Sequence, residues 1–99
     1  MFMVREVLSC QPGKVGELMK KFKALGEVMR GMGLEPFRLY TDVAGDPFWT
    51  LVLERDYEGL DDVLAIESKV MSDERARAAM SGYHELVRSG RREIYKVES

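Results

Sequence analysis

Apolar residues in this chain follow two patterns, one typical of strands and one typical of helices. The order of these patterns along the sequence restricts the possible folds more than any other feature. Four segments have the apolar, β-branched or alternating pattern that predicts strands: residues 2–10, 35–43, 48–55 and 91–97. Residues 14–32, and a region that begins near Asp56 and is split near Ser72, instead repeat apolar residues every three or four positions, which predicts helices. A turn at residues 44–47 is predicted to join the second and third strands into a hairpin.

Local signals predict where the helices begin and end. Pro12 suits the first turn of a helix because its missing N–H would have no partner there, and Gly33 suits a left-handed helix cap. Ser72 is a favourable N-cap. We therefore predict a second helical segment from Ser72 to about Arg88, with Gly90 closing it.

The resulting order predicts an α+β fold in one domain spanning residues 1–99. Its four-stranded antiparallel sheet would carry helices on one face, which is the ferredoxin-like βαββαβ arrangement with a split second helical region. The first strand is apolar on both sides, with Phe2, Val4 and Leu8 on one side and Met3 and Val7 on the other. Because no further helix remains to cover the other face, we expect a second copy of the chain to cover it.

Charge and hydropathy argue against several classes of protein. The formal net charge is −2, with acidic and basic residues interspersed, which does not favour nucleic-acid binding. The longest apolar stretch, residues 48–53, is far shorter than the roughly 20 residues of a membrane helix. Residues 1–6 lack the pattern of a signal peptide. We therefore expect a cytoplasmic protein without a membrane or nucleic-acid partner.

Several residue types also bear on the chemistry of the chain. Cys10 is the only cysteine, so it forms no internal disulfide and is expected to be a small buried hydrophobe. The chain has no Asn and one Gln, Gln11, but many charged residues, a balance that suggests a thermophilic source. Because no HExxH motif, phosphate-binding glycine loop or cluster of metal ligands is present, we expect neither a metal nor a cofactor.

Three short segments carry a family resemblance over nearly the whole length. They are Gln11-Pro12-Gly13-Lys14 after the first strand, Phe48-Trp49 in the hairpin, and Ser72-Asp73-Glu74 before the last helix. With them, the chain resembles the dimeric α/β-barrel superfamily, near its antibiotic-biosynthesis-monooxygenase-like and NIPSNAP-like groups. The resemblance implies that two sheets pair face to face into a barrel and that a small organic molecule binds between sheet and helices.

The same resemblance implies a range of activities. Some members are cofactor-independent oxygenases of polycyclic aromatics, and a related branch degrades haem with an Asn, a Trp and a His. This chain has no Asn, Lys69 lies near the expected place of the Trp, and Met80 lies at that of the His. These departures argue against haem degradation, and the missing His also weakens the related monooxygenases.

Six residues are candidates for a site. His84 is the only histidine and lies beside Tyr83, so these two are the candidate catalytic groups, although the simpler interpretation of His84 is a boundary residue at the edge of the helix's buried face. The candidate ligand-binding residues combine aromatic surface with one charge and are Arg5, Tyr40, Trp49 and Tyr95. Trp49 is also compatible with the core or a dimer interface, and Arg5 with an ion pair to Glu54 across neighbouring strands.

Three functional hypotheses follow. The first is a homodimeric barrel that binds a small hydrophobic or aromatic molecule without acting on it. The second is a cofactor-independent monooxygenase or related enzyme in which His84 or Tyr83 handles a proton and Trp49 stacks on the substrate. The third is a structural or partner-binding module whose sheet is only an oligomer interface.

Overall fold

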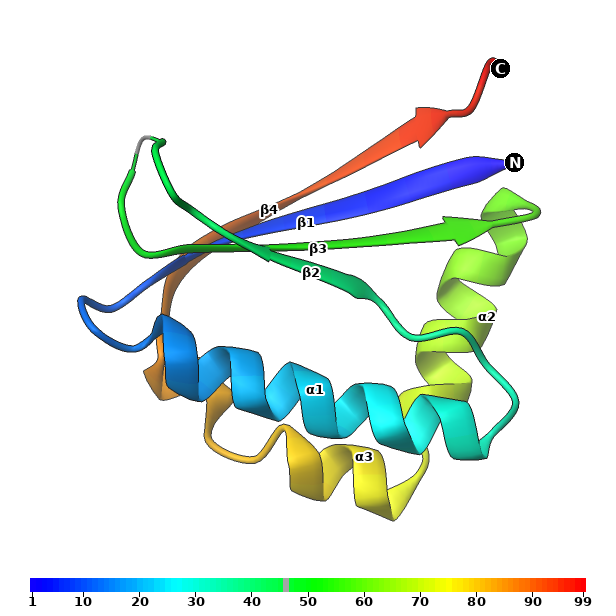
Figure 1. The fold of residues 1–99 in the computed structure, drawn as a ribbon. Coiled ribbons are helices and arrows are strands. Elements are labelled where there is room, and N and C mark those ends of the chain that lie inside the picture. Colours follow the sequence, from blue (N-terminus) through cyan, green and yellow to red (C-terminus); the bar gives the residue numbers. More distant parts are fainter. Residues whose placement is uncertain (46) are drawn as a thin grey trace.

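The computed structural model describes residues 1–45 and 47–99, which fold into one sheet with helices on one of its faces (Figure 1). The elements are β1 (Phe2–Cys10), α1 (Val15–Gly31), β2 (Arg38–Thr41), β3 (Thr50–Tyr57), α2 (Leu60–Met71), α3 (Glu74–Ala79), a short 3₁₀ turn η1 (Tyr83–Glu85) and β4 (Val87–Lys96). The strands are antiparallel in the order β2-β3-β1-β4. The predicted ferredoxin-like α+β fold is therefore confirmed.

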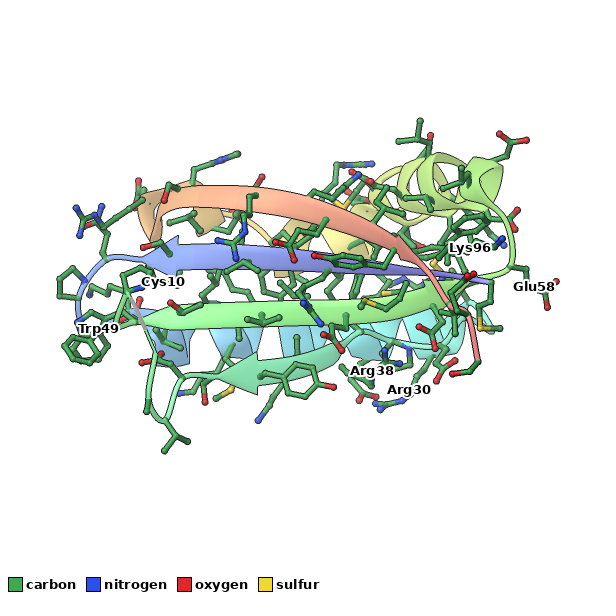
Figure 2. All side chains as sticks on the ribbon, turned by 90° about the horizontal axis from the view of Figure 1, so that it is seen from above. Cys10, Arg30, Arg38, Trp49, Glu58 and Lys96 are labelled. Atoms are coloured by element: carbon green, nitrogen blue, oxygen red, sulfur yellow. The ribbon has the colours of Figure 1, made fainter. Side chains whose placement is uncertain are left out.

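Strand register assigns each side chain to one of two faces. Leu53 in β3 lies opposite Leu39 in β2 and Glu6 in β1, and Glu6 lies opposite Arg92 in β4. These positions are on the helix face, because Leu53 belongs to the buried core between sheet and helices. The residues at alternate positions, among them Arg5, lie on the second face, which no helix covers (Figure 2). We call this second face the open face.

The core lies between β1 and β3 and the apolar side of α1. Its largest fully buried side chains are Leu18, Met29, Leu51, Leu53 and Cys10. Burial of Cys10 raises the pKa of its thiol, so the predicted small buried hydrophobe is what the structure contains. None of the described helices is both long and apolar enough to cross a membrane.

Glycine conformations set the ends of α1. Gly33 has φ +77°, and the N–H of Leu34 donates to the carbonyl of Met29, so α1 ends in the predicted left-handed cap. At the other end the prediction for Pro12 was wrong, because Pro12 precedes the helix. The N–H of Lys14 donates to the carbonyl of Gln11 at 3.0 Å, and this turn has Pro12 and a left-handed Gly13 as its central residues.

The region after residue 71 differs from the prediction of one long helix. Ser72 is the C-terminal cap of α2, and α3 ends at Ala79. Gly82 has φ +79°, so the chain leaves the helical conformation there and forms only the η1 turn. Strand β4 then begins at Val87, which makes Gly90 a strand residue and not a helix terminator.

The N-cap of α3 is Asp73, one residue after the predicted Ser72. Its carboxylate accepts hydrogen bonds from the N–H of Arg75 at 2.8 Å and from the Arg75 side chain, which lower the pKa of Asp73 to about 2. Because the folded-state pKa lies below the usual value of about 3.9, this stabilisation is present above pH 4 and is lost as the pH falls toward 2.

We therefore expect the carboxyl carbon of Asp73 to titrate near pH 2 in NMR spectra. Arg75→Ala is expected to raise the midpoint part of the way back, because the backbone N–H still donates. A midpoint near 4 in the unmodified protein would contradict this account of the cap.

The hairpin strands differ from the prediction, because β2 is shorter and β3 is shifted by two residues toward the C-terminus. β2 covers only Arg38–Thr41, and β3 begins at Thr50 and not at Phe48. Trp49 has φ +63°, a left-handed conformation that interrupts an extended strand. Asp42 fixes the end of the hairpin, because its carboxylate accepts a hydrogen bond from the N–H of Thr50 at 2.8 Å. Of the predicted turn at residues 44–47, Asp46 lies outside the described residues.

Candidate functional site

A cavity of about 410 Å³ lies between the helix face of the sheet and the helices. Its apolar wall is formed by Leu8, Phe22, Leu25, Met71, Met80 and Tyr83. These side chains come from β1, α1, α2, the C-terminal cap of α3 and η1, so five separate elements contribute to the apolar wall. Its size falls within the range of small-molecule sites, which are mostly apolar with a few polar groups.

Gly90 in β4 forms part of the wall of this cavity. It pairs with Leu8 in the sheet, and both residues line the cavity. A Cβ atom at position 90 would lie 2.8 Å from Cδ2 of Leu8, closer than van der Waals contact allows. The Leu8 side chain therefore occupies the space that a side chain at position 90 would need, and the two residues together form this part of the cavity wall.

The polar end of the cavity contains one guanidinium between two carboxylates. Arg92 in β4 donates from Nε to Oε1 of Glu6 at 2.9 Å, and from Nη2 to the same oxygen. The same Nη2 donates to Oε2 of Glu67 in α2 at 3.0 Å. Glu6, Glu67 and Arg92 all line the cavity, so it has a charged end and an apolar body.

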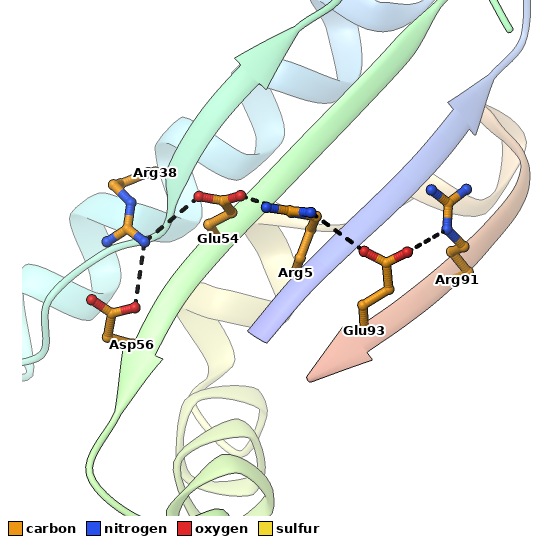
Figure 3. Close-up of polar contacts among 6 residues, drawn as sticks. All are labelled: Arg5, Arg38, Glu54, Asp56, Arg91 and Glu93. Carbon is orange, nitrogen blue, oxygen red and sulfur yellow. Dashed lines mark hydrogen bonds and ion pairs between the residues drawn. The ribbon is translucent and has the colours of Figure 1, made fainter. Parts of the chain in front are cut away.

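The open face carries a chain of ion pairs that runs across all four strands (Figure 3). Oε2 of Glu54 accepts from Nε of Arg5 at 2.8 Å, and Oε1 of Glu54 lies 3.7 Å from Nη2 of Arg38. Glu93 lies 3.6 Å from Arg5 and 2.9 Å from Arg91, and Arg38 also contacts Asp56. We call this set the open-face ion-pair network: Arg5, Arg38, Glu54, Asp56, Arg91 and Glu93.

Charge is balanced within this network. It contains three guanidinium and three carboxylate groups, so its formal charge is zero. The hydrogen bond that Arg5 donates to Glu54 raises the pKa of Arg5, and the hydrogen bond that Glu93 accepts from Arg91 lowers the pKa of Glu93. Each of these two shifts favours the charged form of the group, so the contacts within the network stabilise the ionised Arg5 and Glu93. The predicted pairing of Arg5 with Glu54 is thus present.

Apolar and aromatic side chains flank the network on the open face. Val7 lies opposite Val52, and Val52 lies opposite Tyr40 in the register, so one row of side chains crosses three strands. Arg5 also lies over the ring of Tyr95, 5.6 Å from its centroid. Tyr40 and Tyr95 are each nearly half exposed. The open face therefore combines paired charges with accessible apolar surface.

The structure places the six predicted site residues in four different parts of the molecule. Arg5, Tyr40 and Tyr95 lie on the open face, and Tyr83 lines the cavity. His84 is exposed and stacks on Tyr83, with 4.0 Å between ring centroids, but it does not line the cavity. Figure 2 shows Trp49 at the end of the sheet near Cys10, where its side chain is 45% exposed.

The sequence reasoning did not select the charged end of the cavity. Neither Glu6 nor Arg92 was among the six candidate site residues. The sequence does contain a signal for this end of the cavity, which is a charged residue at an alternate position within an apolar series. In β1 it is Glu6 between Val4 and Leu8, and in β4 it is Arg92 two positions before Ile94. Among residues 1–45 and 47–99, no group of three His, Cys, Asp or Glu side chains is arranged to hold a metal ion.

Sequence comparisons find neither a matching family model nor a matching curated protein. Solved structures do match. One is a NIPSNAP family protein of unknown function from Agrobacterium tumefaciens, which is 19% identical. The match covers 98% of this chain and 87% of that protein, with a TM-score of 0.83. An uncharacterized NIPSNAP domain protein from Burkholderia xenovorans is 16% identical, with coverage of 100% and 96% and a TM-score of 0.80.

A solved antibiotic biosynthesis monooxygenase is 13% identical over the full length of both chains, with a TM-score of 0.71. At these identities the matches concern the backbone arrangement and not the activity. The fold of this chain is the ferredoxin-like α+β fold shared by solved NIPSNAP and antibiotic-biosynthesis-monooxygenase proteins.

Proposed function

We propose that this chain binds a small, largely apolar or aromatic molecule in the cavity between its sheet and helices. The observation that carries the proposal is the cavity of about 410 Å³, with six apolar side chains and one charged end. Gly90 is part of its wall, at a position where a Cβ atom would collide with the Leu8 side chain. A cavity of this kind, with few polar groups, can orient a ligand while its apolar body supplies the affinity.

We further propose that the chain, as one domain, forms a homodimer through the open face. Covering a charged surface usually costs free energy, but here each carboxylate of the network already contacts a guanidinium. The flanking Val7, Val52, Tyr40 and Tyr95 supply apolar area for a second copy to bury. A cytoplasmic location and a thermophilic source remain proposals from composition.

A larger side chain at the cavity wall should weaken ligand binding. Gly90→Leu adds an isobutyl group at the cavity wall, so we expect the affinity for an uncharged apolar fluorescent probe such as N-phenyl-1-naphthylamine to fall at least about tenfold, because the added side chain takes up space in the cavity. Probe fluorescence titration measures this change, and circular dichroism checks that the variant is folded.

Gly16→Leu is the matched control. Gly16 is exposed on α1, and a Cβ there would have nothing within 4 Å. Equal probe affinity in the Gly90→Leu variant and the unmodified protein would overturn the proposed site. Of the predicted catalytic groups only Tyr83 lines the cavity, so binding without chemistry is the function that the geometry favours over an oxygenase.

A further inference from the structure

The charged end of the cavity carries more negative than positive charge. Arg92 is the single guanidinium between the carboxylates of Glu6 and Glu67. Both Arg92 nitrogens that contact Glu6 use the same oxygen, Oε1, and the contact with Glu67 uses only Oε2. Each carboxylate therefore keeps one oxygen for which the described residues supply no hydrogen bond.

No other residue among those that line the cavity balances this excess. Arg91 also lines the cavity, but it pairs with Val7 of the open face in the register, and its Nε donates to Glu93 on that same face at 2.9 Å. Its guanidinium is therefore on the opposite side of the sheet from Glu6. The Glu6 side chain is only 25% exposed, so water screens its charge incompletely.

Resting on the proposed function, we propose that the ligand of this cavity is an apolar molecule that ends in a protonated amine. An ammonium group can donate hydrogen bonds to the free oxygens of Glu6 and Glu67 and neutralise the remaining negative charge. A carboxylate at the same place would add a third negative charge beside two others and would find Arg92 already engaged. An alcohol would donate one hydrogen bond without supplying charge.

Three probes with the same body separate these possibilities: 3-phenylpropylamine, 3-phenylpropan-1-ol and 3-phenylpropionate. In calorimetric titrations at low salt, we expect the amine to bind at least about tenfold more tightly than the acid, with the alcohol between them. Glu67→Gln is expected to reduce the affinity for the amine several-fold and to raise that for the acid. Glu58→Gln, the same change at an exposed site before α2, should alter neither.

The outcomes distinguish this inference from the proposal on which it rests. Binding of the acid as tightly as the amine, abolished by Gly90→Leu, would overturn the amine preference and leave the cavity as a binding site. Binding of none of the probes, or binding that Gly90→Leu leaves unchanged, would overturn both. An amine preference that survives Glu67→Gln undiminished would also contradict the assigned role of Glu67.

Discussion

Replacing Leu53 with alanine is expected to lower the free energy of unfolding by about 3–5 kcal/mol. Leu53 is 1% exposed in the central strand β3, where its side chain belongs to the core beneath α1. The truncation removes buried apolar atoms and leaves a space that close-packed neighbours fill only in part. Chemical denaturation measured by circular dichroism gives the change directly.

The neighbouring residue supplies the control. Val52 precedes Leu53 in β3, but it lies on the open face and is half-buried in the single chain. In a monomer, Val52→Ala should therefore cost only a fraction of the Leu53→Ala effect. A loss below about 1 kcal/mol for Leu53→Ala would contradict the assignment of this face to the core.

Replacing Glu54 with glutamine is expected to raise the dissociation constant of the proposed dimer at least about a thousandfold. Glu54 contacts both Arg5 and Arg38 and is the central carboxylate of the open-face ion-pair network (Figure 3). Without its charge, the network of each copy carries one unbalanced positive charge. In a dimer these charges would be buried against each other, where water cannot screen them.

The same substitution should affect an isolated chain much less, because the side chains of Arg5 and Arg38 are 36% and 44% exposed there and remain in contact with water. Sedimentation equilibrium of the unmodified protein, of Glu54→Gln and of the exposed control Glu98→Gln therefore tests the interface. Glu98→Gln should remain as dimeric as the unmodified protein. A monomeric unmodified protein would overturn the homodimer proposal, and an unchanged dissociation constant for Glu54→Gln would exclude the network from the interface.

Local patterns predicted the elements with strong periodicity. β1 has the predicted bounds of residues 2–10, and α1 lies within one residue of the prediction at each end. The prediction failed at the end of the second helical region, where Met80 and Tyr83 kept an apparent helical spacing across Gly82. A single left-handed glycine outweighs that spacing, because it turns the backbone out of the helical conformation.

The candidate site was predicted only in part. Arg5, Tyr40 and Tyr95 were selected by residue type, and register places them on one face, whereas Trp49 and His84 lie elsewhere. The charged end of the cavity was missed because its three members belong to β1, α2 and β4. Glu6 and Arg92 are 86 positions apart, and no local pattern relates them.

Local sequence patterns were enough to predict the order of strands and helices, the division of the β1 side chains between two faces and the ferredoxin-like arrangement. They were enough because periodicity of 2.0 or 3.6 residues is a property of neighbouring positions, and alternation along a strand assigns each side chain to a face. Only the tertiary structure decided that Glu6, Glu67 and Arg92 meet and that Gly90 borders a cavity. Those facts depend on the register of β4 against β1 and on where the helices cross the sheet. Both are determined jointly by residues that are far apart in the chain.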